Sequence, residues 1–502
     1  MTSVSQIHEI DALSAAARDL FIEVRGPRET QVRGLTRDST AVKPGDMYFC
    51  VPGAKSDGHQ FAGAAIARGA VALCVQRGLD LDPAVTQVVV SDVRRSMGRI
   101  GARFWGEPAS RMLMLGITGT NGKTTTTYLL NSILEAAGRT TGLIGTVETR
   151  IAGRELAGVR TTPDALDLQK LLAEMSSSGV DAVTMEVTSH GLVLNRVEGL
   201  HFAVAAFTNL SQDHLDFHAG MEDYFAAKRS LFTPSFAARG AVNGDDPYGR
   251  ILLREADIPC VAFGTGDDAA VRAEDVTSDS RGSEFLISHP TGEIKIKTPL
   301  IGVFNVSNCL AAAATALQAG VEAGPIEAGI AALKAVPGRF EPVDAGQPFA
   351  VVVDYAHTPD SLDNVLRAAR RFVAPRGGRV LCTFGCGGDR DRAKRPLMGA
   401  VAGRLADFVV VTSDNPRSED PQSIVDAIVE GVIAEVPEGP ADIEVDRRAA
   451  IGRVLSEARP HDIVVLAGKG HETGQEFADY TIPFDDRLVA AEELAALGWG
   501  KA

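Results

Sequence analysis

The sequence has neither a long apolar run nor an excess of basic residues. No stretch approaches the length of a membrane span, and residues 1–10 lack the features of a signal peptide, so we expect the protein to remain in the cytoplasm. The 50 Lys and Arg against 65 Asp and Glu give a net charge of −15, which argues against nucleic acid or an anionic membrane as a partner. The six cysteines are scattered, so no disulfide scaffold is expected, and no second ligand pair supports a zinc site at Cys382 and Cys386.

The chain of 502 residues is too long for one hydrophobic core, and we expect three domains. Short apolar segments separated by glycine-rich turns predict a small α/β domain over residues 1–110. Strands at 112–117, 182–187 and 203–207 alternate with helices and predict a parallel sheet in a central domain over residues 111–340. A third alternation, with strands at 350–353, 379–384, 406–411, 443–445 and 462–466, predicts a Rossmann-like α/β domain over residues 341–502.

A glycine-rich loop, Gly119-Thr-Asn-Gly-Lys-Thr-Thr125, joins the first central strand to the next helix. Its glycines let the backbone approach a ligand, and the N–H groups at the helix start can bind phosphate oxygens. Lys123 can reach the outer phosphates, and the Thr124 hydroxyl can hold Mg2+. Only the shorter form G-x-x-G-K-T is present, because Ile117 stands where the usual pattern begins with glycine. A purely structural turn is the alternative, but Lys-Thr-Thr at this junction favours a P-loop-type ATP-binding domain.

Five other residues of the central region are candidates for the same site. Glu186 ends a strand and could complete Mg2+ coordination as a Walker-B acid, or it could be a solvated strand end. His214 lies in a donor-rich loop and could be a second metal ligand, or part of a capped loop. The spacing around Lys228 indicates no more than a surface lysine on an amphipathic helix. Asn305 either caps a helix or binds a base or ribose, and Arg339 could reach phosphates from the domain hinge.

Polar or glycine-rich motifs follow each of the five C-terminal strands. They are Asp354 to His357, Gly385 to Asp391, Thr412 to Arg417, Asp446 to Arg448 and Ala467 to Glu472. Ligands of open α/β sheets bind outside the carboxyl ends of the strands, so these motifs predict a single crevice.

Together these motifs resemble the Mur ligase family of ATP-dependent amide-forming enzymes, in the expected order and over nearly the whole chain. The shortened phosphate loop is that family's own form. The likeness is greatest to members that add the third peptide residue to UDP-N-acetylmuramoyl-L-alanyl-D-glutamate in peptidoglycan synthesis, through Arg37-Asp-Ser39, Thr161-Thr-Pro163, Gly388 to Asp391, Asp414-Asn-Pro-Arg417 and Gly468 to Glu472. In these members Asp-Asn-Pro-Arg accompanies meso-diaminopimelate, whose distal carboxylate an arginine can clamp, whereas lysine has nothing there to clamp.

The resemblance implies a role for each matching residue. ATP would be bound by Gly119, Thr120, Asn121, Gly122, Lys123, Thr124, Thr125, Asn305, Arg339, Asp354 and His357. Mg2+ would be held by Thr124, Glu186, His214 and a carbamate formed on Lys228, and Lys123, Glu186, His214 and Lys228 would be catalytic. The UDP-linked substrate would be bound by Ser39, Ala54, Lys55, Ser56, Thr161, Thr162, Thr188 and Arg196, and the amino acid by Arg390, Asp414, Asn415, Pro416, Arg417, Gly468 and Glu472. Leu194 and Thr40 depart from the family's pattern and put individual substrate contacts in doubt.

The implied reaction activates the D-glutamate carboxylate with ATP as an acyl phosphate, which the amine of the amino acid then attacks. Three ligands held on three domains must converge, so we expect the domains to close about hinges near residues 110 and 340. We also expect a monomer. The alternatives are a lysine-adding variant, a folate-polyglutamate-type ligase, and a nucleotide-dependent switch without ligation. Asp38-Ser39 and the motif ending at Arg417 argue against the second, and a switch leaves the polar strand-end motifs unexplained.

Overall fold

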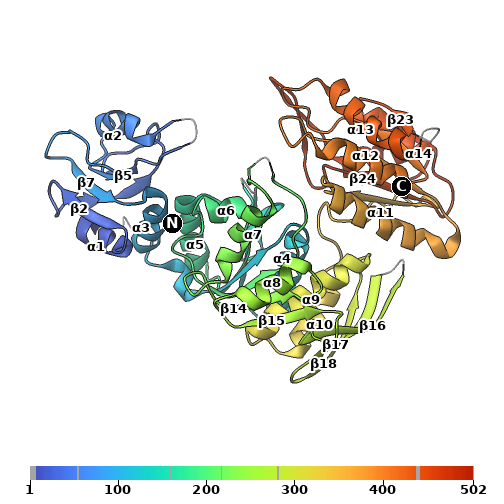
Figure 1. Ribbon diagram of the computed structural model, residues 1–502, viewed down its shortest axis with the longest axis horizontal. Helices are drawn as coiled ribbons and strands as arrows, with labels where there is room; N and C mark the ends of the chain where they lie inside the picture. Colours follow the sequence, from blue (N-terminus) through green and yellow to red (C-terminus); the bar gives the residue numbers. More distant parts are fainter. Residues whose placement is uncertain are drawn as a thin grey trace.

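Three large β-sheets follow one another along the chain, and each has its own hydrophobic clusters (Figure 1). The computed structural model describes residues 7–53, 56–157, 160–215, 217–279, 282–436 and 441–500. Among these residues, no helix is long and apolar enough to cross a membrane. The α/β fold class with three domains, expected from the alternation of strands and helices, is confirmed.

The N-terminal sheet has five strands, of which four are parallel. Helices α1 (Ile10–Ser14) and α3 (Val93–Phe104) pack on one face, and α2 (Ala62–Ala67) packs on the other. Helix α3 also contacts α5 (Ala165–Ser177) of the next unit. The strand order is β2 (Phe21–Arg25), β7 (Thr86–Val90), β6 (Ala72–Val75), β5 (Asp46–Phe49) and β4 (Gly34–Thr36), with β2 antiparallel to β7.

The central sheet has a parallel middle covered by helices on both faces. Helices α4 (Lys123–Ala136), α9 (Val303–Gln318) and α10 (Ala323–Ala332) cover one face. Helices α5, α7 (Met221–Arg229) and α8 (Pro247–Glu255) cover the other. The parallel strands lie in the order β9 (Thr141–Ile144), β12 (Ala182–Glu186), β8 (Leu113–Thr118), β13 (Phe202–Phe207), β14 (Ala237–Asn243), β15 (Cys260–Gly264) and β16 (Val271–Asp279).

Antiparallel strands extend the central sheet at both edges, and our sequence expectations did not include them. At one edge are β10 (Glu148–Ile151) and β11 (Arg154–Ala157), and at the other β17 (Gly282–His289) and β18 (Gly292–Thr298). The signal was present in β18, where Ile294 and Ile296 are buried and the residues between them are polar.

The C-terminal sheet has five parallel strands and one short antiparallel edge strand. Helices α11 (Pro359–Val373), α12 (Lys394–Leu405) and α13 (Pro421–Glu435) cover one face, and α14 (Arg447–Ser456) and α15 (Asp486–Ala496) the other. The order is β19 (Glu341–Pro342), β20 (Ala350–Asp354), β24 (Ile463–Ala467), β21 (Val380–Phe384), β22 (Phe408–Val411) and β23 (Ala441–Ile443). A small hairpin, β25 (Gly474–Glu476) and β26 (Thr481–Pro483), follows β24.

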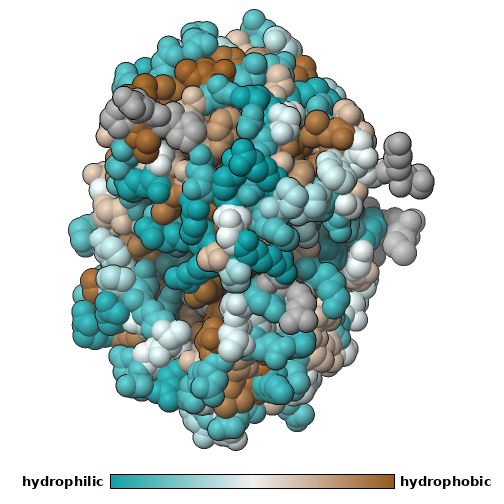
Figure 2. Space-filling model, turned by 90° about the vertical axis from the view of Figure 1, so that its right-hand side faces the viewer, coloured by the Kyte–Doolittle hydropathy of each residue, from teal (hydrophilic) through white to brown (hydrophobic). Residues whose placement is uncertain are grey.

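The start of helix α4 differs from the starts of most C-terminal helices. Thr358, Asp420, Asp446 and Asp485 each cap a C-terminal helix by accepting a backbone N–H. Helix α4 has no such side-chain cap, and its first N–H groups stay available at the end of β8. Figure 2 views the molecule from the C-terminal side of Figure 1, where the surface is mostly hydrophilic and apolar side chains form smaller patches.

Candidate active site

The loop between β8 and α4 fits only glycine at two positions. Gly119 has φ +147°, and a Cβ there would lie 1.9 Å from Thr208 Oγ1. Gly122 has φ +84°, and a Cβ there would lie 2.4 Å from Asn308 Oδ1. The bare backbone therefore turns tightly into the uncapped start of α4, which is the arrangement that binds an anion.

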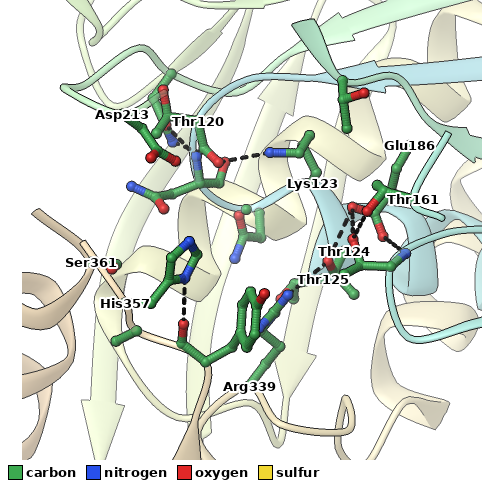
Figure 3. A pocket seen from close by; sticks show the side chains of 18 of the residues that line it. Thr120, Lys123, Thr124, Thr125, Thr161, Glu186, Asp213, Arg339, His357 and Ser361 are labelled. Atoms are coloured by element: carbon green, nitrogen blue, oxygen red, sulfur yellow. Dashed lines mark hydrogen bonds between the residues drawn. The ribbon is translucent and has the colours of Figure 1, made fainter. Parts of the chain in front are cut away.

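Lys123 and Thr124 begin α4; Lys123 is directed toward Thr120, and Thr124 lies beside Arg339 (Figure 3). Lys123 Nζ donates to Gly119 O at 2.9 Å and to Thr120 O at 2.7 Å. Burial lowers the pKa of the Lys123 ammonium, and nearby Glu186 partly opposes that shift. Arg339 Nη2 donates to Thr124 Oγ1 at 3.1 Å, and its guanidinium lies 4.6 Å from the centre of the Tyr355 ring. The start of α4 thus has two cationic side chains directed at it.

Glu186 ends β12 as a buried carboxylate, which excludes a solvated strand end. It is 1% exposed and accepts from Thr146 N at 2.8 Å, Thr146 Oγ1 at 2.9 Å and Thr124 Oγ1 at 3.2 Å. Thr146 also lies 3.1 Å, oxygen to oxygen, from Thr161. Our sequence analysis missed Thr146, because its role comes from the loop after β9 that passes beside β12.

Lys228 was expected at the surface from its spacing, and that expectation is wrong. Its side chain is 1% exposed, because α7 packs this face against the phosphate loop. Nζ donates to Gly119 O at 2.7 Å and lies 4.5 Å from the centre of the Tyr224 ring. Burial first, and then the charge of Lys123, lower the pKa of Lys228 well below its usual value.

His214 lies close enough to Lys123 and Lys228 for their charges to act on its imidazole. Its backbone is in a left-handed conformation with φ 55°. Burial lowers its pKa to about 4, although Asp213, with a carboxylate oxygen 3.5 Å from Nε2, opposes the shift. The imidazole is therefore neutral at neutral pH and able to act as a ligand.

Mg2+ fits the oxygen atoms beside the phosphate loop. Thr124 Oγ1 and Glu186 Oε2 lie 3.2 Å apart, and Mg2+ prefers such oxygen ligands. Within the described part of the chain, no three His, Cys, Asp or Glu side chains cluster as a metal site. A hard cation held by one or two protein groups and completed by phosphate oxygens needs no such cluster.

A cavity of about 620 Å3 unites the phosphate loop with residues expected to bind the two nucleotide-bearing substrates. Asn305 does not line it; that side chain is buried, donates to Ile301 O at 2.9 Å and accepts from Asn308, which does line the cavity. Among the expected residues the cavity wall contains Thr120, Asn121, Gly122, Lys123, Thr124, Thr125, Thr161, Thr162, Glu186, Thr188, Arg196, His214, Arg339, Asp354 and His357.

The last two of these residues come from the C-terminal unit. Burial raises the pKa of Asp354 to about 6, although Arg339 and the N–H groups of Phe340 and Ala356, each at 2.7 Å, oppose the shift. Burial lowers the pKa of His357, whose Nδ1 lies 2.8 Å from Tyr355 O. Both side chains thus reach the nucleotide cavity from the end of β20.

The residues expected to bind the UDP-linked substrate are only partly brought together. Thr162 accepts from Thr188 N at 3.1 Å, and Arg196 Nη1 donates to Thr162 O at 3.0 Å. Ser39 and Ser56 belong to the N-terminal unit and do not line the cavity, and Ala54 and Lys55 lie outside the described residues. Three arginines surround Asp164 at the junction of the two units, with Arg37 at 2.5 Å, Arg160 at 2.7 Å and Arg196 at 3.2 Å.

The residues expected to bind the amino acid lie at the C-terminal strand ends and do not line the nucleotide cavity; we call this group of residues the amino-acid crevice. Asn415 Nδ2 donates to Glu472 Oε2 at 2.8 Å. Arg417 Nη1 donates to Gly388 O at 2.9 Å, and its Nε donates to Glu476 at 2.8 Å. Gly468 has φ +110°, and a Cβ there would lie 2.6 Å from Asp414 Oδ2. Pro416 lies between these residues, while Arg390 is exposed beside them and contacts Asp389 O at 3.4 Å.

Asp360, at the start of α11, connects the phosphate loop to the C-terminal unit. Its Oδ2 accepts from Asn121 Nδ2 at 2.7 Å and from Ser211 Oγ at 2.9 Å. Our sequence analysis missed Asp360, because its partners are 239 and 149 residues away in the chain. The local sequence marks Asp360 only as an acidic residue in a helix's first turn.

Three family profiles match the chain in order. They are "Mur ligase family, catalytic domain" over residues 31–104, "Mur ligase middle domain" over residues 117–316, and "Mur ligase, glutamate ligase domain" over residues 338–470.

Curated relatives match over nearly their whole length. The chain is 49% identical over 481 residues to the UDP-N-acetylmuramoyl-L-alanyl-D-glutamate–2,6-diaminopimelate ligase of Solibacter usitatus, covering 94% of this chain and 95% of that protein. It is 44% identical to the ligase of the same name from Syntrophomonas wolfei, covering 95% and 98%.

Two solved structures are similar to this chain over most of its length. One with that ligase's name is 31% identical and superposes with a TM-score of 0.70 over 98% of this chain and 99% of the other. A folylpolyglutamate synthase from Mycobacterium tuberculosis is 18% identical, with a TM-score of 0.62 over 82% of this chain and 95% of its own, and shares the fold alone.

Proposed function

We infer, from the premise that the chain belongs to the Mur ligase family, that its nucleotide cavity and its C-terminal crevice serve one ligation. The enzyme is an ATP-dependent ligase of peptidoglycan synthesis that forms an amide bond between UDP-N-acetylmuramoyl-L-alanyl-D-glutamate and 2,6-diaminopimelate. The observation that carries this function is the match over 94% of the chain to a relative of that name. We propose the meso isomer as the amino acid used.

The proposed chemistry begins at the start of α4. The D-glutamate carboxylate attacks the γ-phosphorus of ATP, ADP leaves, and an acyl phosphate results. Lys123, at the loop, and Arg339, 3.1 Å from Thr124 Oγ1, would stabilise the charge that develops on the transferred phosphoryl group. The amine of diaminopimelate then attacks the acyl carbon, and the tetrahedral intermediate collapses to amide and inorganic phosphate. Mg2+, when bound beside Thr124 and Glu186, would neutralise phosphate charge.

The ligand assignments follow the two sites. We propose that ATP lies along the loop from Gly119 to Thr125, with Asn305 supporting Asn308 from behind and with Asp354 and His357 contacting the nucleoside. The UDP-linked substrate would extend from the N-terminal unit along Thr161, Thr162, Thr188 and Arg196 into the cavity. The amino acid would bind in the crevice at Arg390, Asp414 to Arg417, Gly468 and Glu472. Of these side chains, Arg417 has an Nη2 group without a hydrogen-bond partner among the described residues, which leaves a donor for a substrate carboxylate.

We propose that Lys228 is carbamylated by CO2. Only a neutral amine reacts with CO2, and burial beside Lys123 holds the pKa of Lys228 well below its usual value. The carbamate would place a carboxylate near His214, where a second Mg2+ needs an oxygen ligand. A carbamate resonance in the NMR spectrum of enzyme supplied with 13C-bicarbonate, absent in Lys228→Met, is the expected result. A spectrum identical for both proteins would contradict carbamylation.

We also propose the three domains at residues 1–110, 111–340 and 341–502, joined in a monomer. The gaps between the matched profiles support these bounds, because the gap at residues 105–116 contains residue 110 and the gap at residues 317–337 ends three residues before 340. Because ATP and UDP-linked precursors are made in the cytoplasm, we propose that compartment for the reaction.

Phosphate release tests the function. Purified enzyme with ATP, Mg2+ and the UDP-dipeptide should release phosphate when meso-diaminopimelate is added, and far less with L-lysine. Equal rates with the two amino acids would indicate the lysine-adding variant. No release with any diamino acid would overturn the proposed reaction.

A further inference from the structure

Lys469, in the second position after β24, has a buried side chain with no role in the chemistry above. It is 0% exposed, although it lies in the loop after β24 between Gly468 and Glu472, which are expected to bind the amino acid. Its ammonium donates to Gly474 O at 2.6 Å, Asn415 Oδ1 at 3.0 Å and Glu472 Oε2 at 3.2 Å. An ammonium has three donors, so these acceptors use all of them. A side chain buried in this way supports its neighbours and does not touch a substrate.

The contact with Lys469 decides how the Asn415 amide is turned. An ammonium group has no acceptor, so the amide oxygen of Asn415 must face it. The same oxygen accepts from Glu476 N at 3.0 Å, which uses both of its lone pairs. The amide nitrogen therefore points to the opposite side, where Nδ2 donates to Glu472 Oε2 at 2.8 Å.

Glu472 is held through one carboxylate oxygen only. Its Oε2 accepts from Lys469 and Asn415, while Oε1 has no hydrogen-bond partner among the described residues. The side chain remains 30% exposed, so its free oxygen can reach a ligand. Two fixed donors on one oxygen leave the other oxygen in a defined position, as an acceptor for an ammonium group.

We propose that Lys469 is a positioning residue for amino-acid recognition. It fixes the Asn415 amide and the Glu472 carboxylate, so that Glu472 Oε1 receives an ammonium group of the diamino acid. This inference rests on the function proposed above. It also assigns Asn415 a supporting role, because its oxygen is fully used within the protein.

The test compares KM values for the separate substrates. In Lys469→Met, we expect the KM for meso-diaminopimelate to rise about tenfold or more, because the hydrogen bonds of the ammonium group to Asn415 and Glu472 are lost. The KM for ATP and for the UDP-dipeptide should stay within about twofold, and kcat should fall less than the amino-acid KM rises. Lys170→Met, on the exposed face of α5, is the matched control and should leave every KM unchanged.

Asn415→Asp keeps an oxygen that accepts from Lys469, but it places a second oxygen opposite Glu472 Oε2. This variant tests the positioning role if Lys469→Met does not fold. It should raise the same KM. If both folded variants keep the wild-type KM for the diamino acid, or if all three KM values rise equally, the positioning role is wrong. If the wild-type enzyme shows no release that depends on a diamino acid, the proposed function fails and this inference fails with it.

Discussion

The nucleotide cavity and the amino-acid crevice differ in the groups to which their cationic side chains donate hydrogen bonds. In the cavity, Lys123 and Arg339 donate to backbone carbonyls or to a hydroxyl, and neither forms an ion pair with a carboxylate among the described residues. In the crevice, Lys469 and Arg417 each donate to a glutamate.

This difference matches the charge of the proposed ligands. A polyphosphate brings several negative charges, so a site that keeps its cations free of carboxylates has the charge ready for the ligand. The pKa of Lys123, lowered by burial and further by the charge of Arg339, is consistent with two cations held close together before an anion arrives. A diamino acid brings charges of both signs, and a crevice with paired acids and bases can meet each of them.

Replacing Lys123 with methionine should have the largest effect, because it removes a free cation of the nucleotide cavity. We expect kcat/KM for ATP to fall by at least about a thousandfold, because the charge nearest the transferred phosphate is lost. Diaminopimelate-dependent phosphate release measures the change. Calorimetric binding of the diamino acid alone should remain as in the wild type, and a variant with nearly full activity would contradict the role of Lys123.

Replacing the buried Arg447 should lower the stability of the protein and leave catalysis largely unchanged. Arg447 and Asp486 are both 0% exposed in their side chains, and Arg447 also donates to Ser413 O at 3.2 Å and Ala467 O at 3.0 Å. Arg447→Met leaves a buried carboxylate unpaired, and we expect a loss of about 3–5 kcal/mol in the free energy of unfolding. Denaturant unfolding measures this loss.

The double variant Arg447→Met/Asp486→Leu provides the control. Much of the lost stability should return, because no buried charge is left unpaired. A double variant no more stable than the single one would show that the contacts with Ser413 and Ala467 matter more than the charge balance.

Replacing Arg417 with alanine tests the role of the amino-acid crevice in the same comparison. We expect the KM for meso-diaminopimelate to rise about a hundredfold, since a charge-assisted contact to its distal carboxylate is lost. The KM for ATP should change little, because Arg417 lies outside the nucleotide cavity. Steady-state kinetics with each substrate varied in turn gives both values, and equal losses would refute the clamp.

Asp360→Asn should have the smallest effect, because it weakens the link between the two units without removing a ligand contact. The neutral amide keeps one acceptor oxygen for Asn121 and Ser211, and we expect the KM for ATP to rise only a few-fold. Asp363→Asn, on the same helix and paired with Arg367 at 2.5 Å, is the matched control. Identical kinetics for both variants would show that Asp360 does not support the loop.

Local patterns in the sequence predicted much of this architecture. The expected strand at 112–117 is β8 at Leu113–Thr118, and the C-terminal strands fall within about two residues of their expected bounds. These elements combine an apolar run with a polar or glycine-rich end, so the strand and the start of the site lie in one short segment.

Long-range contacts could not be predicted in the same way. The burial of Lys228 depends on α7 packing against the phosphate loop, and the roles of Thr146 and Asp360 depend on partners at least 40 residues away. Resemblance to a family suggested Lys228, but its own spacing did not. Lys469 stood inside a recognised motif, and only its burial distinguishes a supporting residue from one that binds substrate.

Arg417 has a backbone φ of 52°, in the left-handed region that suits glycine. A residue with a Cβ pays about 1–2 kcal/mol for this conformation. Glycine would adopt this conformation at position 417 without that cost, but it would lack the guanidinium that the crevice uses. Selection for thermal stability alone would favour losing this arginine, so any effort to make the enzyme more heat-resistant must hold position 417 constant.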